Sequence, residues 1–139
     1  MLEAGSYSIK SSSLDAFIGL DPDSNDSFAA LPLGAPPAKW QISPMGDNKF
    51  RIESNGFLAA EKSNELKAVS DGEPAWIIDA ISHHGPNLYI ILSAEDGGRG
   101  WCAGYEPGES IKARPLLIGP SLPPFYPPNE RFEIVPVGP

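Results

Sequence analysis

Hydrophobic residues in this chain recur at alternate positions within short runs, and the same runs return three times. The first set consists of a large aromatic residue, one spacer and an isoleucine: Tyr7–Ile9, Phe50–Ile52 and Tyr89–Ile91. Its members lie about 40 residues apart, which indicates an internally repeated architecture. Side chains two positions apart in a β-strand point to the same face. Each aromatic residue and its isoleucine are therefore predicted to enter one shared core.

Two further sets of residues keep the same period. Their members are Trp40–Ile42, Trp76–Ile78 and Phe132–Ile134 in one set, and Phe17–Gly19, Phe57–Ala59 and Trp101–Ala103 in the other. A buried face that is repeated in this way predicts three equivalent units, approximately residues 1–46, 47–86 and 87–139.

Short runs typical of β-strands follow one another at a spacing of roughly ten residues, with turn residues between them. Asn55-Gly56 and Asp71-Gly72, for example, supply the positive φ that tight turns need. The 16 prolines and 14 glycines leave few uninterrupted windows of the ~10–12 residues that a helix requires. The expected strands are Tyr7–Lys10, Ala16–Leu20, Phe28–Leu31, Lys39–Ser43, Lys49–Glu53, Phe57–Ala60, Leu66–Ser70, Ala75–Ala80, Leu88–Ser93, Gly100–Gly104, Ser110–Arg114 and Arg131–Pro136.

Three units of four strands without a helix predict an all-β protein, and specifically a β-trefoil, in which three hairpins close a six-stranded barrel. Closure also removes the exposed sheet edges that a soluble protein must otherwise protect. The 139 residues suit a single domain. Another all-β sandwich or an open barrel is the alternative.

Charge and composition exclude several classes of partner. The net charge is −8, and the 10 lysines and arginines are scattered, which argues against binding to nucleic acid phosphates. The same charge would repel anionic membranes, and no apolar run approaches the ~18 residues of a membrane-spanning helix. The N-terminus lacks the features of a signal peptide, and one cysteine cannot form an internal disulfide. We therefore expect a cytoplasmic, disulfide-free monomer.

Three residues invite a catalytic or metal-binding interpretation. His83 and His84 are adjacent, but neighbouring side chains on an extended segment diverge, so the pair is predicted to lie in a solvated turn. Cys102 could act as a nucleophile. Its counterparts in the repeat are Ile18 and Leu58, however, which favours a buried core thiol.

The segment Asp21–Asp26 begins like a calcium-binding loop, with oxygen-bearing side chains at alternate positions. Its sixth position is Asp26 instead of glycine and its twelfth is Pro32 instead of glutamate, so calcium is not expected. The chain has no glycine-rich phosphate loop after a strand and no Gly-x-Ser-x-Gly elbow. We therefore expect no metal, no cofactor and no enzymatic activity.

Two longer loops break the threefold symmetry. Leu20–Ser27 is acidic and polar, and Leu116–Asn129 is rich in proline. Because proline rings fix φ, a proline-rich loop loses less entropy when it binds a partner. Stiff exposed loops on a rigid scaffold suit binding better than catalysis, although the prolines could equally serve only to keep a long connection ordered.

The opening Gly5–Ile9, the middle Lys39–Pro44 and the ending Pro128–Val137 resemble the mushroom β-trefoil serine protease inhibitors. The mycocypin cysteine protease inhibitors are more distant relatives. The likeness spans nearly the whole chain and rests mainly on structural motifs. It implies a fungal, intracellular protein that inhibits proteases, either in defence or to restrain an internal protease.

Members of these families present a surface loop to the protease, and different members use different loops. The resemblance implies that the loop between the second and third strands is one such place, with Asn25 near its tip as the P1 side chain that fills the specificity pocket. A rigid scaffold would make this substrate-like binding reversible and low in entropy cost. The residues of this loop are Asp23, Ser24, Asn25, Asp26 and Ser27.

The expected target is a trypsin-like serine protease, with a cysteine protease as a second option. A trypsin-like pocket prefers lysine or arginine, whereas the Leu20–Ser27 loop has neither and carries three aspartates that would weaken docking. Lys62 and Arg99 in other loops are therefore alternative P1 residues, with ordinary surface charge as the competing interpretation. Asn64 would suit an asparagine-specific cysteine protease. Arg114 is a poor candidate, because a proline follows it within a predicted strand.

A carbohydrate-binding trefoil lectin is the alternative function. Aromatic residues near loops could stack on sugar rings. The Gln-x-Trp signature of ricin-type lectins is absent, however, because the only glutamine, Gln41, follows Trp40. The tryptophans also occupy positions of the repeat that are predicted to lie in the core.

Overall fold

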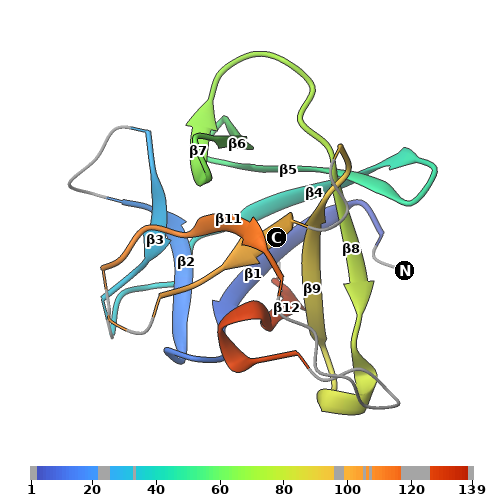
Figure 1. The fold of residues 1–139 in the computed structure, drawn as a ribbon. Helices are drawn as coiled ribbons and strands as arrows, with labels where there is room; N and C mark the ends of the chain where they lie inside the picture. Colours follow the sequence, from blue (N-terminus) through green and yellow to red (C-terminus); the bar gives the residue numbers. More distant parts are fainter. Residues whose placement is uncertain are drawn as a thin grey trace.

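The structure, a computed structural model, describes residues 3–21, 26–32, 34–95, 99–104, 106, 108–116 and 126–137. Within these ranges it contains twelve strands and two 3₁₀ helices, η1 (Ser82–His84) and η2 (Pro128–Glu130) (Figure 1). No helix in this part of the chain is long and apolar enough to cross a membrane. The strands are β1 Gly5–Ser11, β2 Ala16–Leu20, β3 Phe28–Ala30, β4 Trp40–Gly46, β5 Lys49–Ser54, β6 Phe57–Lys62, β7 Glu65–Val69, β8 Trp76–Ala80, β9 Leu88–Ser93, β10 Arg99–Cys102, β11 Lys112–Pro115 and β12 Phe132–Pro136.

All twelve predicted strands are present, and the all-β class is confirmed. The bounds of β2 and β9 match the prediction at both ends. Strand β4 continues past Ser43 to Gly46, because Gly46 still pairs with Lys49 beyond an irregularity in the register. Strand β11 begins later than expected, since Ser110 forms an isolated bridge to Ala29 instead. Two three-residue 3₁₀ helices, η1 and η2, tighten two turns, and the described residues contain no α-helix.

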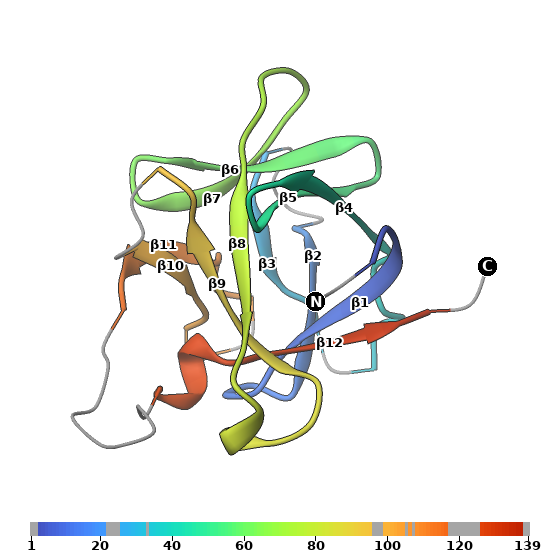
Figure 2. The ribbon, with the colours of Figure 1, turned by 90° about the vertical axis from the view of Figure 1, so that its right-hand side faces the viewer.

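Half of the strands close into a ring of antiparallel pairs, in the order β1, β4, β5, β8, β9, β12 and back to β1. Figure 2 shows β8, β9, β12 and β1 of this ring from the side. The register repeats around the ring, so that each aromatic residue of the first set lies opposite one of the second set. The pairs are Tyr7 with Trp40, Phe50 with Trp76, and Tyr89 with Phe132.

The other strands form three hairpins, β2–β3, β6–β7 and β10–β11, which contact one another. Strand β7 pairs with β11 at Glu65 and Lys112, and Lys67 of β7 forms a bridge to Ser27, just before β3. The bridge between Ala29 and Ser110 joins the first hairpin to the third. Each hairpin is therefore held by both others, and this arrangement positions the loops at their ends.

Trp101 lies at the centre of the core, among the three repeat-related aromatic residues of the second set. Its ring centroid is 5.8 Å from that of Trp40, 5.7 Å from that of Trp76 and 5.9 Å from that of Phe132. All four side chains are buried. Tilted and edge-on contacts at these separations stabilise a core beyond the area that is buried. The aromatic residues that repeat in the sequence therefore pack together in the core, around Trp101.

The indole nitrogens of the three tryptophans differ in their hydrogen bonds. Trp40 donates to the carbonyl oxygen of Ile18 and Trp76 to that of Ala59, both at 2.8 Å. Each bond ties a strand of the ring to a hairpin. The buried Nε1 of Trp101 has no hydrogen-bond partner among the residues that the structure describes. An unsatisfied buried donor has a free-energy cost, so packing must outweigh it at this position.

Candidate functional site

The loop between β2 and β3 is closed at its base by the backbone. The N–H of Asp21 donates to the carbonyl oxygen of Ser27 at 2.8 Å, which joins the two ends of the loop. Of the five predicted loop residues, Asp26 and Ser27 are described, whereas Asp23, Ser24 and Asn25 lie outside the described residues. The part of the site that the structure brings together is therefore the base of the loop and what holds it.

Strand β7 holds the C-terminal end of this loop with both backbone and side-chain contacts. The N–H of Ala68 donates to the carbonyl oxygen of Asp26 at 2.8 Å. The Lys67 ammonium donates to Ser27 Oγ at 3.0 Å and lies 3.7 Å from Asp26 Oδ1. These contacts link the loop to a neighbouring hairpin some forty residues further along the chain.

Exposure changes abruptly at the end of the loop. Ser27 is 7% exposed, whereas the side chain of the preceding residue, Asp26, is 65% exposed. The chain thus leaves the packed surface within one residue. A fixed loop base reduces the conformational entropy that is lost when a loop binds a partner.

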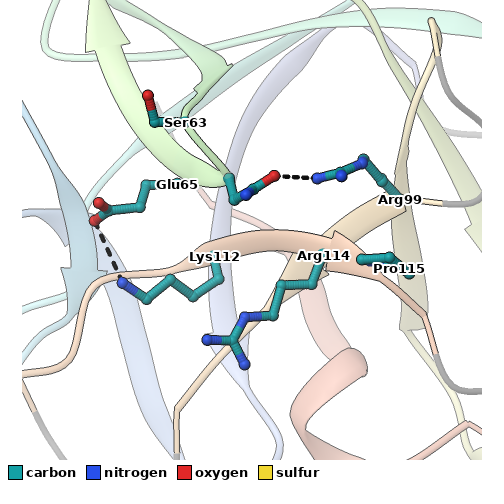
Figure 3. A pocket seen from close by; sticks show the side chains of 7 residues that line it. Ser63, Glu65, Arg99, Lys112, Arg114 and Pro115 are labelled. Atoms are coloured by element: carbon teal, nitrogen blue, oxygen red, sulfur yellow. Dashed lines mark hydrogen bonds and ion pairs between the residues drawn. The ribbon is translucent and has the colours of Figure 1, made fainter.

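Arg99, the first alternative P1 residue, lies across the β6–β7 turn. Its Nη1 donates to Oδ1 of Asn64 (Figure 3). The same nitrogen donates to the carbonyl oxygen of Ala113 at 3.3 Å. An arginine that fills a protease pocket must extend away from its own surface. Arg99 would have to break both hydrogen bonds before it could do so. Asn64 would likewise have to break the bond that its side-chain oxygen accepts from Arg99.

Lys62, the second alternative, ends β6 in an exposed position opposite Glu65. The two turn residues that follow, Ser63 and Asn64, have φ of 55° and 66°. Two consecutive residues with positive φ form the tight turn that continues strand twist in a two-residue hairpin. Such a turn is not the extended backbone of a bound substrate, so its geometry argues against Lys62 as a P1 residue.

A hollow of about 420 Å³ lies beside Arg99, where the second and third hairpins meet (Figure 3). Within it, Lys112 Nζ is 3.4 Å from Glu65 Oε1, and Ser110 Oγ donates to the same oxygen at 3.2 Å. The Ser110 hydrogen bond and the charge of Lys112 lower the pKa of Glu65. These contacts join the second and third hairpins. The lining residues are Ser63, Asn64, Glu65, Arg99, Lys112, Arg114 and Pro115.

The other candidate residues do not form a reactive centre. Cys102 is buried as predicted, and burial, reinforced by the charge of Glu130, raises its pKa to about 11. The thiolate that a nucleophile needs is therefore scarce near neutral pH. No group of three or more His, Cys, Asp or Glu within the described ranges could hold a metal ion.

The predicted divergence of His83 and His84 was wrong, because the two residues lie in the 3₁₀ helix η1 and not on an extended segment. Their ring centroids are 4.5 Å apart. His84 Nε2 accepts a hydrogen bond of 3.1 Å from the N–H of Tyr126. Both histidine rings lie near Tyr126, in the segment before η2. These contacts help to hold that segment in place and do not form a reactive centre.

Lys67 is the residue at this site that sequence reasoning missed. A lysine in a predicted strand carries no signal of its own. Its role depends on the register between β7 and the segment before β3, which the structure records as the bridge to Ser27. The acidic character of the loop was the only available hint, because a nearby cation would offset it.

The geometry defines a small all-β protein with an anchored acidic loop, and comparisons with solved structures agree with the fold. A proteinase inhibitor from Coprinopsis cinerea is similar, with a TM-score of 0.88 and 23% identity over 99% of this chain and 100% of that one. A ricin B-like lectin from Macrolepiota procera, solved with lactose, has a TM-score of 0.76 and 15% identity over 99% of both chains. At these identities the likeness concerns the fold alone.

The sequence comparisons are more specific. The family model described as peptidase inhibitor I66 matches residues 1–136. A protein named serine protease inhibitor from Lentinula edodes is 35% identical over 99 residues, which cover 69% of this chain and 68% of that relative. The chain therefore belongs to the peptidase inhibitor I66 family. The resemblance to fungal protease inhibitors is confirmed, and the protein is an inhibitor and not an enzyme.

Proposed function

We propose that this protein inhibits trypsin-like serine proteases reversibly, through substrate-like binding of the β2–β3 loop with Asn25 as the P1 residue. The match of the peptidase inhibitor family to residues 1–136 carries the proposal. The serine protease inhibitor from Lentinula edodes supports the serine class. The anchored loop base supports the choice of loop, because rigid presentation reduces the entropy lost on docking.

We further infer that the fold is a β-trefoil of three four-stranded repeats in a single domain. The ring of paired strands and the three hairpins support it. The aromatic pairs that recur in the same register in each third support it as well. We expect the protein to act as a monomer in the cytoplasm. Its one cysteine is buried and free, which suits a reducing compartment.

The electrostatics of the loop shape the expected specificity. Asp26 lies close to Lys67, which offsets its charge, so the loop is less acidic than its sequence implies. Asn25 would enter the specificity pocket as a neutral polar side chain. It would forgo the ion pair that lysine or arginine makes there, so affinity depends on the rigidity of the loop and on complementary contacts around it.

The direct test is titration of the purified protein against trypsin, subtilisin, papain and an asparaginyl protease. We expect inhibition of trypsin and loss of inhibition in Asn25→Ala. Lys62→Ala and Arg99→Ala are the matched variants for the alternative P1 residues, and each should retain the inhibition constant. Absence of inhibition of all four enzymes at about micromolar concentration would overturn the proposal.

Carbohydrate binding is the second candidate, because the ricin B-like lectin from Macrolepiota procera shares the fold. The tryptophans argue against it. Trp40, Trp76 and Trp101 are at most 2% exposed, so none is available to stack on a sugar ring. A glycan array decides between the two functions, since we expect no selective binding to any glycan.

A further inference from the structure

Lys67 bridges two parts of the molecule that the sequence keeps apart. We infer that Lys67 is a positioning residue for inhibition: it holds Asp26 and Ser27, the residues that follow the Asn25–Asp26 bond, in place while a protease acts on that bond. This inference rests on the proposed function and on the assignment of Asn25 as P1.

The Lys67 ammonium contacts the two residues that follow that bond in the sequence. It donates to Ser27 Oγ at 3.0 Å and lies 3.7 Å from Asp26 Oδ1. Its side chain is 24% exposed, so water screens these contacts less than those of a fully exposed lysine. Lys67 itself is fixed within β7, where it pairs with Ala60 of β6. The lysine therefore joins the loop to a rigid hairpin.

Two backbone hydrogen bonds hold the same segment independently of Lys67. Ala68 N–H donates to the carbonyl oxygen of Asp26, and Asp21 N–H donates to that of Ser27, both at 2.8 Å. Loss of the lysine should therefore loosen the loop without unfolding it. The apparent affinity of an inhibitor falls in proportion to the fraction of molecules whose loop is in the binding conformation.

The chemistry of a serine protease explains why this side of the bond matters. The enzyme's serine hydroxyl attacks the carbonyl carbon of Asn25, forms an ester and transfers its proton to the departing nitrogen of Asp26. In the reverse step the Asp26 amine attacks the ester, the peptide bond re-forms and the proton returns to the serine oxygen. Hydrolysis requires water to reach the ester instead. An amine held beside the ester reacts with it far faster than a free one.

Lys67 also offsets part of the loop's negative charge. The loop carries three aspartates, and an acidic specificity pocket would repel them. The ammonium beside Asp26 reduces this repulsion at the residue next to the scissile bond. The anchoring of Asp26 and Ser27 and the offset of negative charge therefore both favour binding to the protease. A variant that keeps a cation in a similar place should keep both effects.

The test compares Lys67→Met, which keeps most of the apolar stem, with Lys67→Arg, which keeps the cation. Lys112→Met is the matched control, because Lys112 makes the corresponding contact to Glu65 at the next hairpin junction. Two quantities are measured with trypsin: the inhibition constant, and the rate at which mass spectrometry detects fragments 1–25 and 26–139. Urea unfolding of each variant reports its stability.

We expect Lys67→Met to raise the inhibition constant about tenfold and to speed cleavage after Asn25 several-fold. Lys67→Arg should recover most of both, and Lys112→Met should change neither. Unchanged inhibition and cleavage in Lys67→Met, or an equal effect of Lys112→Met, would overturn the role of Lys67 alone. Cleavage at another bond would overturn the loop assignment with it, and a wild-type protein without inhibition would overturn the proposed function itself.

Discussion

Among single residues, the three tryptophans show how one residue type is held in different ways. Trp40 and Trp76 each donate an indole hydrogen bond to a hairpin carbonyl, whereas Trp101 is held by aromatic packing. Their burial could be predicted from the repeat. Their hydrogen bonds could not, because the acceptors, Ile18 and Ala59, are set by how the hairpins meet the ring.

We predict that Trp40→Phe destabilises the protein by about 1 kcal/mol more than Trp101→Phe does. Both substitutions remove a similar volume from the core. Only the first leaves a buried carbonyl oxygen, that of Ile18, without its indole donor. Urea unfolding of the two variants measures the difference. Equal losses of unfolding free energy would contradict the assignment of these hydrogen bonds.

Glu65 gives a prediction for pH. Its pKa in the folded protein lies below the ordinary 4.5, first through Ser110 and then through Lys112. The unfolded chain therefore takes up the proton first as the pH falls, so the stabilisation is complete above about pH 4.5 and is lost below it. We expect Glu65→Gln to flatten the acid side of the stability curve, with a small amplitude because the side chain is 34% exposed. The unfolding free energies of the wild type and of Glu65→Gln are measured from roughly pH 3 to 6. The same pH dependence in both proteins would contradict the prediction.

At the scale of elements, the strands were predictable because alternation is a local property. Strand β5 alternates buried residues with exposed or half-buried ones, and turns bound it on both sides. The 3₁₀ helix η1 was not predictable, since His83 and His84 in a turn carry no periodic signal. The contact of Lys67 with Ser27 was also out of reach, because it requires the pairing of segments from different hairpins.

The approach of β10 to β9 gives a prediction at this scale. A Cβ atom on Gly100 would lie 2.4 Å from the carbonyl oxygen of Ile91, which only a backbone shift could relieve. We expect Gly100→Ala to cost about 1–3 kcal/mol of unfolding free energy. Gly5→Ala is the control, since the nearest atom to its added Cβ, on Tyr7, is 3.8 Å away. Denaturation midpoints of the two variants should differ accordingly, and equal midpoints would contradict the close approach.

For the whole molecule, the last strand is the closing member of the ring. Strand β12 pairs with β1 on one side and β9 on the other, and it contributes the buried Phe132 and Ile134. The sequence pattern indicated this strand and its buried face. It did not indicate which loop contacts which hairpin, and for this reason an inhibitory loop could be proposed only through resemblance.

We predict that a chain ending at Glu130 does not fold, because β1 and β9 lose their shared partner and the core loses two large side chains. A chain ending at Val137 keeps all of β12 and should fold normally. Proton NMR spectra distinguish the two results, since dispersed amide signals require a unique packed state. Dispersed signals from the shorter chain would show that the ring is not needed.

The shared interior of Trp40, Trp76 and Trp101 has a practical consequence for spectroscopy. Indole side chains that are buried away from water fluoresce at the short-wavelength end of their range. Coupling among neighbouring rings also contributes to the ultraviolet circular dichroism of the protein. A protease that docks on a surface loop would leave this signal unchanged. Titrations must therefore follow turnover of a chromogenic substrate or a dye on the loop, and a red shift of the inhibitor's own emission would report unfolding.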